Sequence, residues 1–311
     1  MRPTFEGENP INVLSFNATG DGITDDTAAL QKAINQAGVT PVFLPFGTYL
    51  ISSTITLPPG AALVGELGST LQAKGGAAAF SDASNPQPMI SVPSGQGARL
   101  VDLLLSTVQD VPGCILLDWQ GSSTAPSGLW DVSARLYGIA SDVFIVHGEG
   151  AGVYYEEGWL WVADHDIDSG QTLTIKNPRG MTITNTGSGS SYLYGTASEH
   201  SQYYQYNISN ASNVTAILIQ TETDYWSTPP TGFAINLEDS RDINIYGTGN
   251  YNWFNGNQTD IFMIKNTTGN FYGINVHGVE NVISGDVTLP AYTPIEEEWF
   301  CDGFTSWQNG A

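Results

Sequence analysis

The chain has 311 residues, 41% of them hydrophobic, which is enough to bury a substantial core. Nine basic residues against 31 acidic ones give a net charge of −22, which argues against binding to nucleic acid or to an anionic membrane. No run approaches the roughly 18 apolar residues of a membrane span. A polyanionic sugar would be repelled unless calcium bridged it, whereas a neutral polymer would not.

The N-terminal part of the chain contains the clearest helix. It lacks the apolar stretch of a signal peptide, so either such a segment was removed or the chain is a piece of a longer protein. Residues 12–38 predict a capping segment, with a short strand at 12–14, a tight turn at 19–22 and a helix near 26–37 that ends at Gly38. Thr24, Asp25 and Asp26 offer N-caps, and the two carboxylates offer favourable negative charge at the helix start. Its apolar face is formed by Ala28, Leu30, Ala33, Ile34 and Ala37.

After the helix, the chain consists of short β-branched strands that Pro and Gly interrupt. Several open with a polar pair ending in Asn or Asp, as at Ser212-Asn213 and Arg241-Asp242, and the spacing fits solenoid coils of roughly 20–30 residues. A two-sheet sandwich would also have many short strands. The helix favours a β-solenoid, because the open end of such a stack must be covered. We expect one domain, 1–311, with a tail from about 286 to 311 over the body.

Cysteines and glycosylation signals indicate the compartment. Cys114 and Cys301 are either two free thiols or one disulfide that closes a long loop in an oxidising environment. Few lysines, many glycines and aromatics, and six Asn-x-Ser/Thr sequons together predict a secreted, extracellular glycoprotein. The sequon asparagines are Asn17, Asn207, Asn210, Asn213, Asn257 and Asn266.

The segment 194–226 carries the strongest chemical signal. Glu199 and Glu222 lie 23 residues apart, about one structural repeat, among Tyr, Trp and amide side chains. Sugar hydrolysis needs a carboxyl that stays protonated to donate to a leaving oxygen, and aromatic faces that hold the ring. This pattern predicts that the two carboxylates lie on adjacent coils, open to one surface, within about 10 Å of each other.

The string Asp164-His165-Asp166-x-Asp168 invites a metal interpretation. On a strand, its three carboxylates would share one side, which suits calcium; a structural network that joins the coils is the alternative, and we favour it. The four histidines show no metal-ligand spacing, and no phosphate-binding or dinucleotide-binding motif is present. The sequence therefore predicts no cofactor and no metal.

Two sets of motifs resemble known proteins. The opening FNATGDGITDDTAALQKAINQAG, followed by VFLPFGTYLISSTITLPPGAALVGE, resembles the start of pectate-lyase-like right-handed parallel β-helices. Four later segments resemble glycoside hydrolase family 55, the β-1,3-glucanases of fungi and bacteria, and the similarity covers nearly the whole chain. These segments are YYEEGWLWVADHDID (154–168), PRGMTI (178–183), LYGTASEHSQYYQYNIS (193–209) and ILIQTETDYW (217–226).

The resemblance assigns roles to residues and implies a partner. It implies that Glu222 is the general acid, that Glu199 is a second carboxylate and that Tyr225 is the aromatic beyond the acid. Family members carry two tandem β-helix halves with the active site between them, and this chain matches the second half only. The groups that position the attacking water belong to the first half, an N-terminal partner. The family has Pro where this chain has Asp224.

Each candidate has a structural alternative. Glu222 could be a solvent-facing residue of a Thr-rich strand, and Glu199 could be a structural carboxylate that His200 or a backbone amide holds. Tyr225 and Trp226 are the best candidates for stacking on sugar, against the alternative of ordinary core. Further substrate-binding candidates are His200, Gln220 and Trp161, although a buried β-helix Trp is an equal reading of Trp161.

The sequence predicts an enzyme, an inverting β-1,3-glucanase acting on laminarin-like glucan, of which this chain is one half. The alternative is a non-catalytic β-glucan-binding or structural β-helix module, which the missing half favours. Pectin cleavage is disfavoured by the net charge of −22 and by the lack of a basic residue clustered with the carboxylates.

Overall fold

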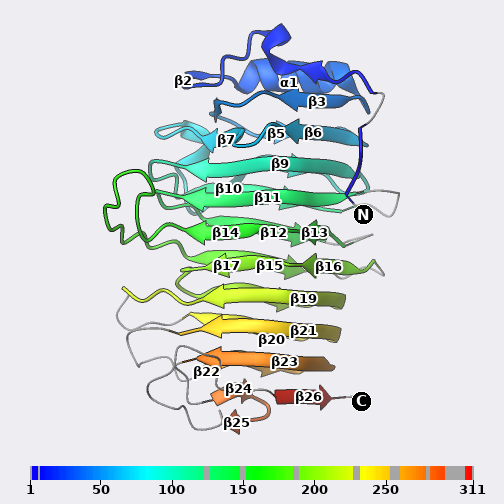
Figure 1. The fold of residues 1–311 in the computed structure, drawn as a ribbon, viewed down its shortest axis with the longest axis vertical. Helices are drawn as coiled ribbons and strands as arrows, with labels where there is room; N and C mark the ends of the chain where they lie inside the picture. The colour runs from blue at the N-terminus through cyan, green and yellow to red at the C-terminus, as the bar shows by residue number, and fades with distance from the viewer. Residues whose placement is uncertain are drawn as a thin grey trace.

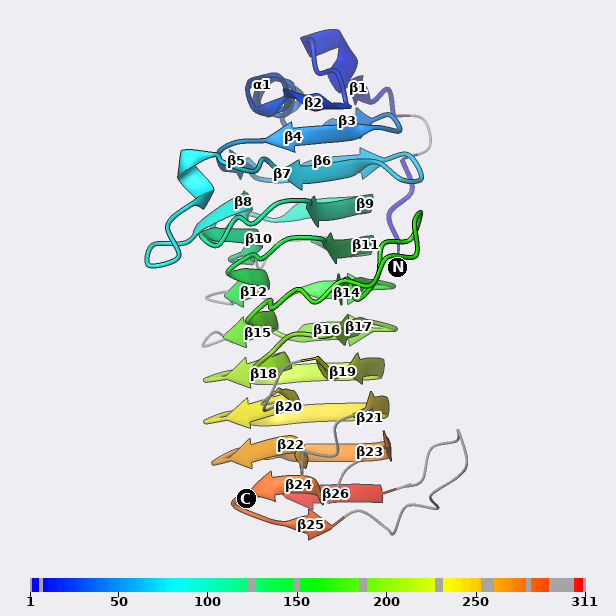
Figure 2. The same ribbon diagram turned by 90° about the vertical axis from the view of Figure 1, so that its left-hand side faces the viewer.

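A computed structural model describes residues 2–5, 8–121, 127–147, 152–184, 189–226, 232–252, 260–277, 281–290 and 305–309. The chain winds into a right-handed parallel β-helix whose coils stack along the long axis (Figure 1 and Figure 2). The solenoid expected from the strand pattern is confirmed, and the two-sheet sandwich is not the fold. Helical turns are few in the described chain: α1 (Thr27–Ala37), η1 (Val13–Phe16) and η2 (Ala78–Phe80).

The larger sheet has 16 strands and carries the candidate site. Its strands are parallel except the last, which pairs antiparallel with its neighbour. Eleven of them form its main path, and five more pair alongside. Its main path is β1 (Ile11–Asn12), β3 (Pro41–Leu44), β6 (Ala61–Gly65), β9 (Ala98–Thr107), β11 (Gly128–Leu136), β13 (Tyr154–Glu156), β16 (Ser191–Tyr194), β19 (Ser212–Glu222), β21 (Arg241–Tyr251), β23 (Gly269–His277) and β26 (Thr305–Asn309). The five others are β2 (Asp21–Asp25), β4 (Thr48–Ile51), β7 (Thr70–Ala73), β14 (Trp159–Val162) and β17 (Ala197–Glu199).

The smaller sheet has 10 strands and closes the opposite side of each coil (Figure 2). Its inward side chains stack in register from coil to coil, which buries a continuous apolar column: Ile90, Leu117, Phe144, Met181, Tyr206, Ile235, Phe262 and Ile283. The strands are β5 (Ile55–Thr56), β8 (Gln87–Val92), β10 (Cys114–Trp119), β12 (Asp142–His147), β15 (Arg179–Thr184), β18 (Tyr204–Ser209), β20 (Phe233–Glu238), β22 (Asp260–Lys265), β24 (Asn281–Gly285) and β25 (Leu289–Pro290).

Helix α1 covers the N-terminal end of the stack, as the sequence predicts (Figure 1). Leu30 and Ile34 are buried and line an interior space with side chains of the first coils, among them Val42 and Ile90. This contact shields the apolar interior of the first coil, which would otherwise open to water.

Local details of the capping segment differ from the expectation. The strand expected at residues 12–14 is the pair Ile11–Asn12 followed by the turn η1. Asp26 stands at the N-cap position without capping the helix, because its buried carboxylate accepts hydrogen bonds from the amides of Thr19 and Gly20 at 2.7 and 3.1 Å. The side chain of Asp25 instead accepts a hydrogen bond from Thr27 Oγ1 at 2.6 Å. Position alone could not tell which Asp caps.

Residues in the left-handed backbone region form a column across the larger sheet. Asp102 and Asp131 have φ of 58° and 53° on adjacent strands, and Leu218 has φ of 54° within β19. Gly195, at φ 61°, falls between β16 and β17 in the neighbouring coil and separates the two strands. The column therefore divides each coil of this sheet into two segments. The second segment, β14, β17 and the end of β19, carries Glu199 and Glu222.

The polar pairs that open successive coils align, as the spacing suggests. Ser212 pairs with Arg241 in the ladder, and Asn213 and Asp242 both have left-handed backbone. On the other sheet, the side-chain amide of Asn236 donates to Asn207 Oδ1 at 2.7 Å, across 29 residues of sequence. Such amide ladders satisfy polar groups that stacking would otherwise bury without partners.

The compartment markers and the tail are placed as follows. Cys114 is a free, buried thiol whose pKa burial raises, which favours the free-thiol alternative over the disulfide, and Cys301 lies outside the described residues. Described parts of the tail, β25 and β26, pair antiparallel with β24 and β23.

No helix in the described ranges is long and apolar enough to cross a membrane. Of the sequon asparagines, Asn17, Asn210 and Asn266 are exposed, Asn207 and Asn213 are half-buried, and Asn257 lies outside the described residues.

Candidate active site

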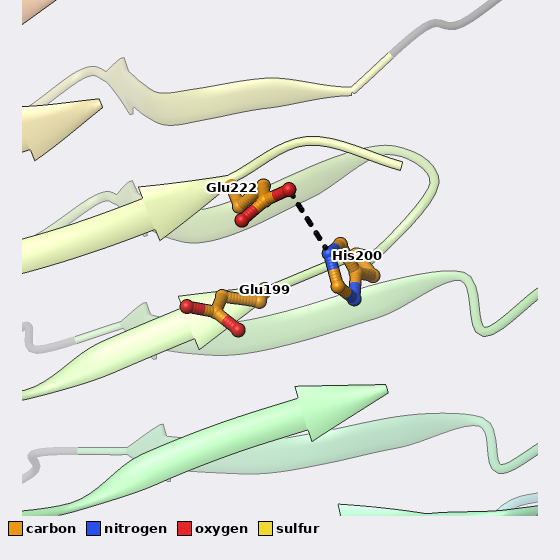
Figure 3. A group of neighbouring side chains, drawn as sticks. All are labelled: Glu199, His200 and Glu222. Carbon is orange, nitrogen blue, oxygen red and sulfur yellow. Dashed lines mark ion pairs between the residues drawn. The ribbon is translucent and has the colours of Figure 1, made fainter. Parts of the chain in front are cut away.

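The ladder of the larger sheet brings the two glutamates together. Glu199 ends β17 and Glu222 ends β19, and these residues are register partners on adjacent coils. The row runs from Trp161 on β14 through Glu199 and Glu222 to Tyr251 on β21. Because partners in a parallel, in-register ladder project to the same side, the carboxyl groups face one surface. One carboxylate oxygen of each residue lies within 4.8 Å of the other (Figure 3).

An open pocket lies over this row. Its volume is about 530 Å³, which includes solvent at the mouth. It is lined by Trp159, Trp161, Asp164, His165, Glu199, His200, Glu222 and Tyr225. Five of the seven predicted catalytic and substrate-binding residues therefore meet here, and Gln220 and Trp226 do not line the pocket. A concave site with aromatic walls and a few convergent polar groups is the usual form of a ligand site.

Glu199 is the more buried of the two glutamates. Burial raises the pKa of its carboxyl above the ordinary value, and the nearby Glu222 adds to this rise. Hydrogen bonding with Gln220 and Trp159 and the charge of His200 oppose the rise without cancelling it. Gln220 therefore contributes to the site by its hydrogen bond to Glu199, although it does not line the pocket. Glu222 keeps 23% of its side chain exposed, so it is the carboxyl that an entering ligand can reach.

His200 follows Glu199 directly and is nearly fully buried. Its Nδ1 lies 2.9 Å from the carbonyl oxygen of Val162, and its Nε2 lies 3.6 Å from Glu222 Oε1. The second contact is an ion pair that is too long for a hydrogen bond. Burial lowers the pKa of His200, but Glu222, the Val162 carbonyl and Glu199 together outweigh burial and raise it.

The aromatic residues after Glu222 pack against His200. Tyr225 and Trp226 meet the imidazole edge-on, with ring centroids 5.4 and 5.1 Å from its own. Tyr225 donates its hydroxyl hydrogen bond to Asp164, and burial together with this bond raises the pKa of Tyr225. Trp226 directs its indole N–H to the carbonyl of Ile175 at 3.0 Å. Tyr225 is therefore a pocket wall, whereas Trp226 supports that wall from behind.

The Asp-His-Asp string does not form the strand edge that a calcium site would need. Strand β14 ends at Val162, so the alternation argument fails for Asp164, Asp166 and Asp168. Asp164 contacts His165 and Tyr225, while Asp166 holds a turn by accepting from the amide of Ser169 at 2.7 Å. Asp164 thus links two coils that are 61 residues apart in sequence, as the structural-network interpretation expects.

One group in the described chain has ligand atoms at metal-binding distances, namely Glu199, His200 and Glu222. The same spacing suits two carboxylates with a histidine counter-charge, which needs no ion.

Three pocket residues, Asp164, His165 and Trp159, are not among the predicted catalytic and substrate-binding residues, and Trp159 is the one with a large aromatic surface. It stacks on Trp161 with ring centroids 4.9 Å apart and an interplanar angle of 20°. Trp161 is only 2% exposed, whereas Trp159 is 39% exposed and presents its free face to the pocket. The sequence could have predicted this residue, because residues 159 and 161 are two positions apart on one strand and therefore lie on the same side of the sheet.

A family model described as rhamnogalacturonase A/epimerase, pectate lyase-like, matches residues 10–98. Among curated proteins, the chain is 36% identical over 77% of its length to a protein of Arthroderma benhamiae named "Probable glucan endo-1,3-beta-glucosidase", and covers 31% of that protein. It is 30% identical over 81% of its length to "Glucan 1,3-beta-glucosidase" of Cochliobolus carbonum, and covers 38% of it. The chain thus spans about a third of these relatives.

Two further matches are to an effector protein and to a solved structure. The chain is 28% identical over 71% of its length to "Non-secreted LysM effector LysM15" of Penicillium expansum, and covers 18% of that protein. Among solved structures, sacteLam55A from Streptomyces sp. SirexAA-E superposes with a TM-score of 0.55 over 91% of this chain and 52% of that one. At 17% identity, this likeness concerns the fold alone.

Proposed function

We propose that this chain, whose resemblance to glycoside hydrolase family 55 is confirmed by its fungal relatives, forms the acid-bearing half of a β-1,3-glucan hydrolase. Relatives that match most of the chain are named as glucan 1,3-β-glucosidases. The observation that carries the proposal is the Glu199–Glu222 pair, in register on adjacent coils and open to an aromatic-walled pocket.

In this proposal Glu222 is the general acid. It donates its proton to the glycosidic oxygen while a water molecule attacks the anomeric carbon from the opposite face, which inverts the configuration. Tyr225 and Trp159 offer aromatic surface to the sugar, since the C–H faces of glucose pack well on such rings.

Glu199 is not the catalytic base in this scheme. Inverting enzymes keep their two carboxyl groups about 6.5–9.5 Å apart to leave room for the water. Oxygens of Glu199 and Glu222 lie within 4.8 Å, which leaves no such room. Glu199 instead stands beside the acid as a second carboxyl, whose pKa burial raises. The greater exposure of Glu222 makes it the carboxyl that reaches the glycosidic oxygen.

The groups that position the attacking water lie outside this chain in the proposal. The chain spans about a third of its glucosidase-named relatives, and its pocket is open, so a further β-helix half would complete the cleft. We treat residues 1–311 as one domain of that enzyme. The fungal relatives and the exposed sequons at Asn17, Asn210 and Asn266 favour an extracellular glycoprotein, whereas the LysM15 relative is named as non-secreted.

A second candidate is a β-glucan-binding or structural module without turnover. The similarity to LysM15, a protein named as an effector, favours it. The two candidates differ in one observable. A binding module binds laminari-oligosaccharides and releases no sugar, whichever partner is added. The hydrolase half gains turnover when a partner completes its cleft.

The test is laminarin hydrolysis by the native protein, with intact mass and gel filtration to show which polypeptides travel with this chain. We expect glucose or short laminari-oligosaccharides from the completed enzyme and little product from the 311-residue chain alone. Binding without hydrolysis by the completed enzyme would replace this proposal with the binding module.

A further inference from the structure

His200 is held in one orientation by its backbone and by its Nδ1. Its φ of 67° is left-handed, and its backbone N–H donates to the carbonyl of Glu222 at 2.8 Å. Because the Val162 carbonyl can only accept, the Nδ1 atom at 2.9 Å must carry a hydrogen. The tautomer and the direction of the ring are thus fixed, and a flip would break the bond to Val162.

The other ring nitrogen faces Glu222. Nε2 is buried, makes no hydrogen bond, and points at Glu222 Oε1 from 3.6 Å (Figure 3). The rings of Tyr225 and Trp226 pack edge-on against the imidazole. A buried nitrogen without a hydrogen-bond partner is costly. The position of Nε2 is explained if this nitrogen is protonated, because the imidazolium then places its positive charge beside the carboxylate of Glu222.

The surroundings of His200 are acidic. Glu222 at the end of β19, Glu199 at the end of β17 and Asp164 after β14 all act on its charge, and Tyr225 is the further titratable group packed on the ring. In the described part of the chain, His200 is the one basic side chain that forms an ion pair with either glutamate. Two carboxylates within 4.8 Å of each other repel, and a positive charge on His200 offsets that repulsion.

We propose that His200 is the positioning residue of the carboxylate pair, an imidazolium whose Nε2–H faces the carboxylate that remains when Glu222 gives up its proton. This role rests on the proposed function for its catalytic consequence. Nothing is transferred from His200 in the step: the proton leaves Glu222 for the glycosidic oxygen, and the imidazolium balances the new charge. Preorganised charge of this kind stabilises a transition state without reorganisation.

An equilibrium experiment tests the pairing without activity. Proton and nitrogen NMR titration of the 311-residue chain follows His200, assigned by its loss in the variant His200→Asn. We expect its midpoint above the ordinary value of about 6.5, and a fall of about one pH unit in Glu222→Gln, which removes the facing charge. The control is Glu238→Gln on β20, of the other sheet, which should leave the midpoint in place. An unchanged midpoint in Glu222→Gln overturns the proposal.

His200→Asn tests the catalytic consequence in the completed enzyme. Asn accepts left-handed backbone and can keep a donor near the Val162 carbonyl, so the variant retains the local fold and loses only the Nε2 side. We expect kcat to fall with KM nearly unchanged, because His200 is too buried to bind sugar. The basic limb of the pH profile should move to higher pH, since the variant removes the imidazolium charge that favours the ionised form of the neighbouring carboxyls. If the variant lost activity while its pH profile kept the wild-type limbs, His200 would have only a structural role, which would contradict the proposal.

The two experiments separate two failures. If the NMR midpoint moves but Glu222→Gln retains turnover, the His200–Glu222 pairing stands and the proposed acid is wrong. If the midpoint does not move, the inference about His200 fails whatever the activity.

Discussion

Glu199 and Glu222 are direct partners in the parallel ladder between β17 and β19, so one coil of the solenoid carries each carboxyl of the pair. The fold brings the two residues to the same position on successive coils, because stacked coils repeat positions in register. One glutamate is buried with a raised pKa and the other remains accessible. Two carboxyls in unlike surroundings are the arrangement that divides acid chemistry between them.

The first prediction concerns stereochemistry. If Glu199 is not a nucleophile, the completed enzyme should release the α-anomer first from a β-1,3-glucan, because water attacks directly. Proton NMR in the first minutes of hydrolysis, before mutarotation, reads this out. The β-anomer as first product would mean retention. In that case the close approach of Glu199 to Glu222 marks a nucleophile, and the inverting scheme is wrong.

The second prediction concerns the dependence of stability on pH. Since the pKa of Glu199 is raised in the folded state, its contribution to stability is complete in acid and is lost as pH rises through the raised value. Glu199→Gln cannot ionise and escapes this loss. The difference in Tm, variant minus wild type, should therefore be more positive at about pH 7 than at about pH 4. Scanning calorimetry at both values checks this, and an equal difference at both would show that burial does not perturb Glu199.

The third prediction compares two tryptophans. Trp159→Ala removes the exposed indole of the pocket, while Trp226→Ala removes a ring that supports His200 from behind. Truncating an aromatic ring that stacks on sugar should weaken laminari-oligosaccharide binding by about tenfold, the equivalent of about 1.4 kcal/mol. Calorimetric titration should show this loss for Trp159→Ala. Trp226→Ala should lower Tm more than it lowers affinity. The reverse ranking would mean that the sugar surface lies elsewhere.

The fourth prediction tests the cap. Leu30→Ala on α1 opens a cavity against the first coils and should cost about 2–5 kcal/mol in the free energy of unfolding. Gln36→Ala lies on the exposed face of the same helix and should change stability by less than about 0.5 kcal/mol. Denaturant unfolding of both variants makes the comparison. Equal effects would mean that the helix does not close the stack.

The sequence predicts features that repetition governs. Apolar spacing located α1, and the 23-residue interval between Glu199 and Glu222 anticipated their pairing, because coil length sets which residues align. The sequence did not predict contacts that depend on the residue at which a strand ends. β14 ends at Val162, so Asp164 turns toward Tyr225 instead of sharing a side with Asp166. Long-range contacts of this kind connect residues 61 positions apart, and local patterns do not contain them.

Other differences reflect competition between near-equivalent neighbours. Either Asp25 or Asp26 could cap α1, but the buried carboxylate of Asp26 accepts hydrogen bonds from the turn at Thr19 and Gly20 instead. Both Trp159 and Trp161 could face a sugar, and stacking buries the second under the first. Composition and periodicity treat such neighbours alike, whereas packing distinguishes them.

The variant Glu222→Gln tests the central claim most directly. Gln keeps the size and one acceptor of Glu222 but cannot protonate a leaving oxygen, so laminarin turnover by the completed enzyme should fall by about 10²–10⁴. Oligosaccharide binding should persist, and an activated aryl glucoside, which needs less protonation, should lose less. Glu238→Gln, on the other sheet, is the matched control and should retain full activity. Near-normal laminarin turnover by Glu222→Gln would contradict the account and transfer the role of acid to Glu199.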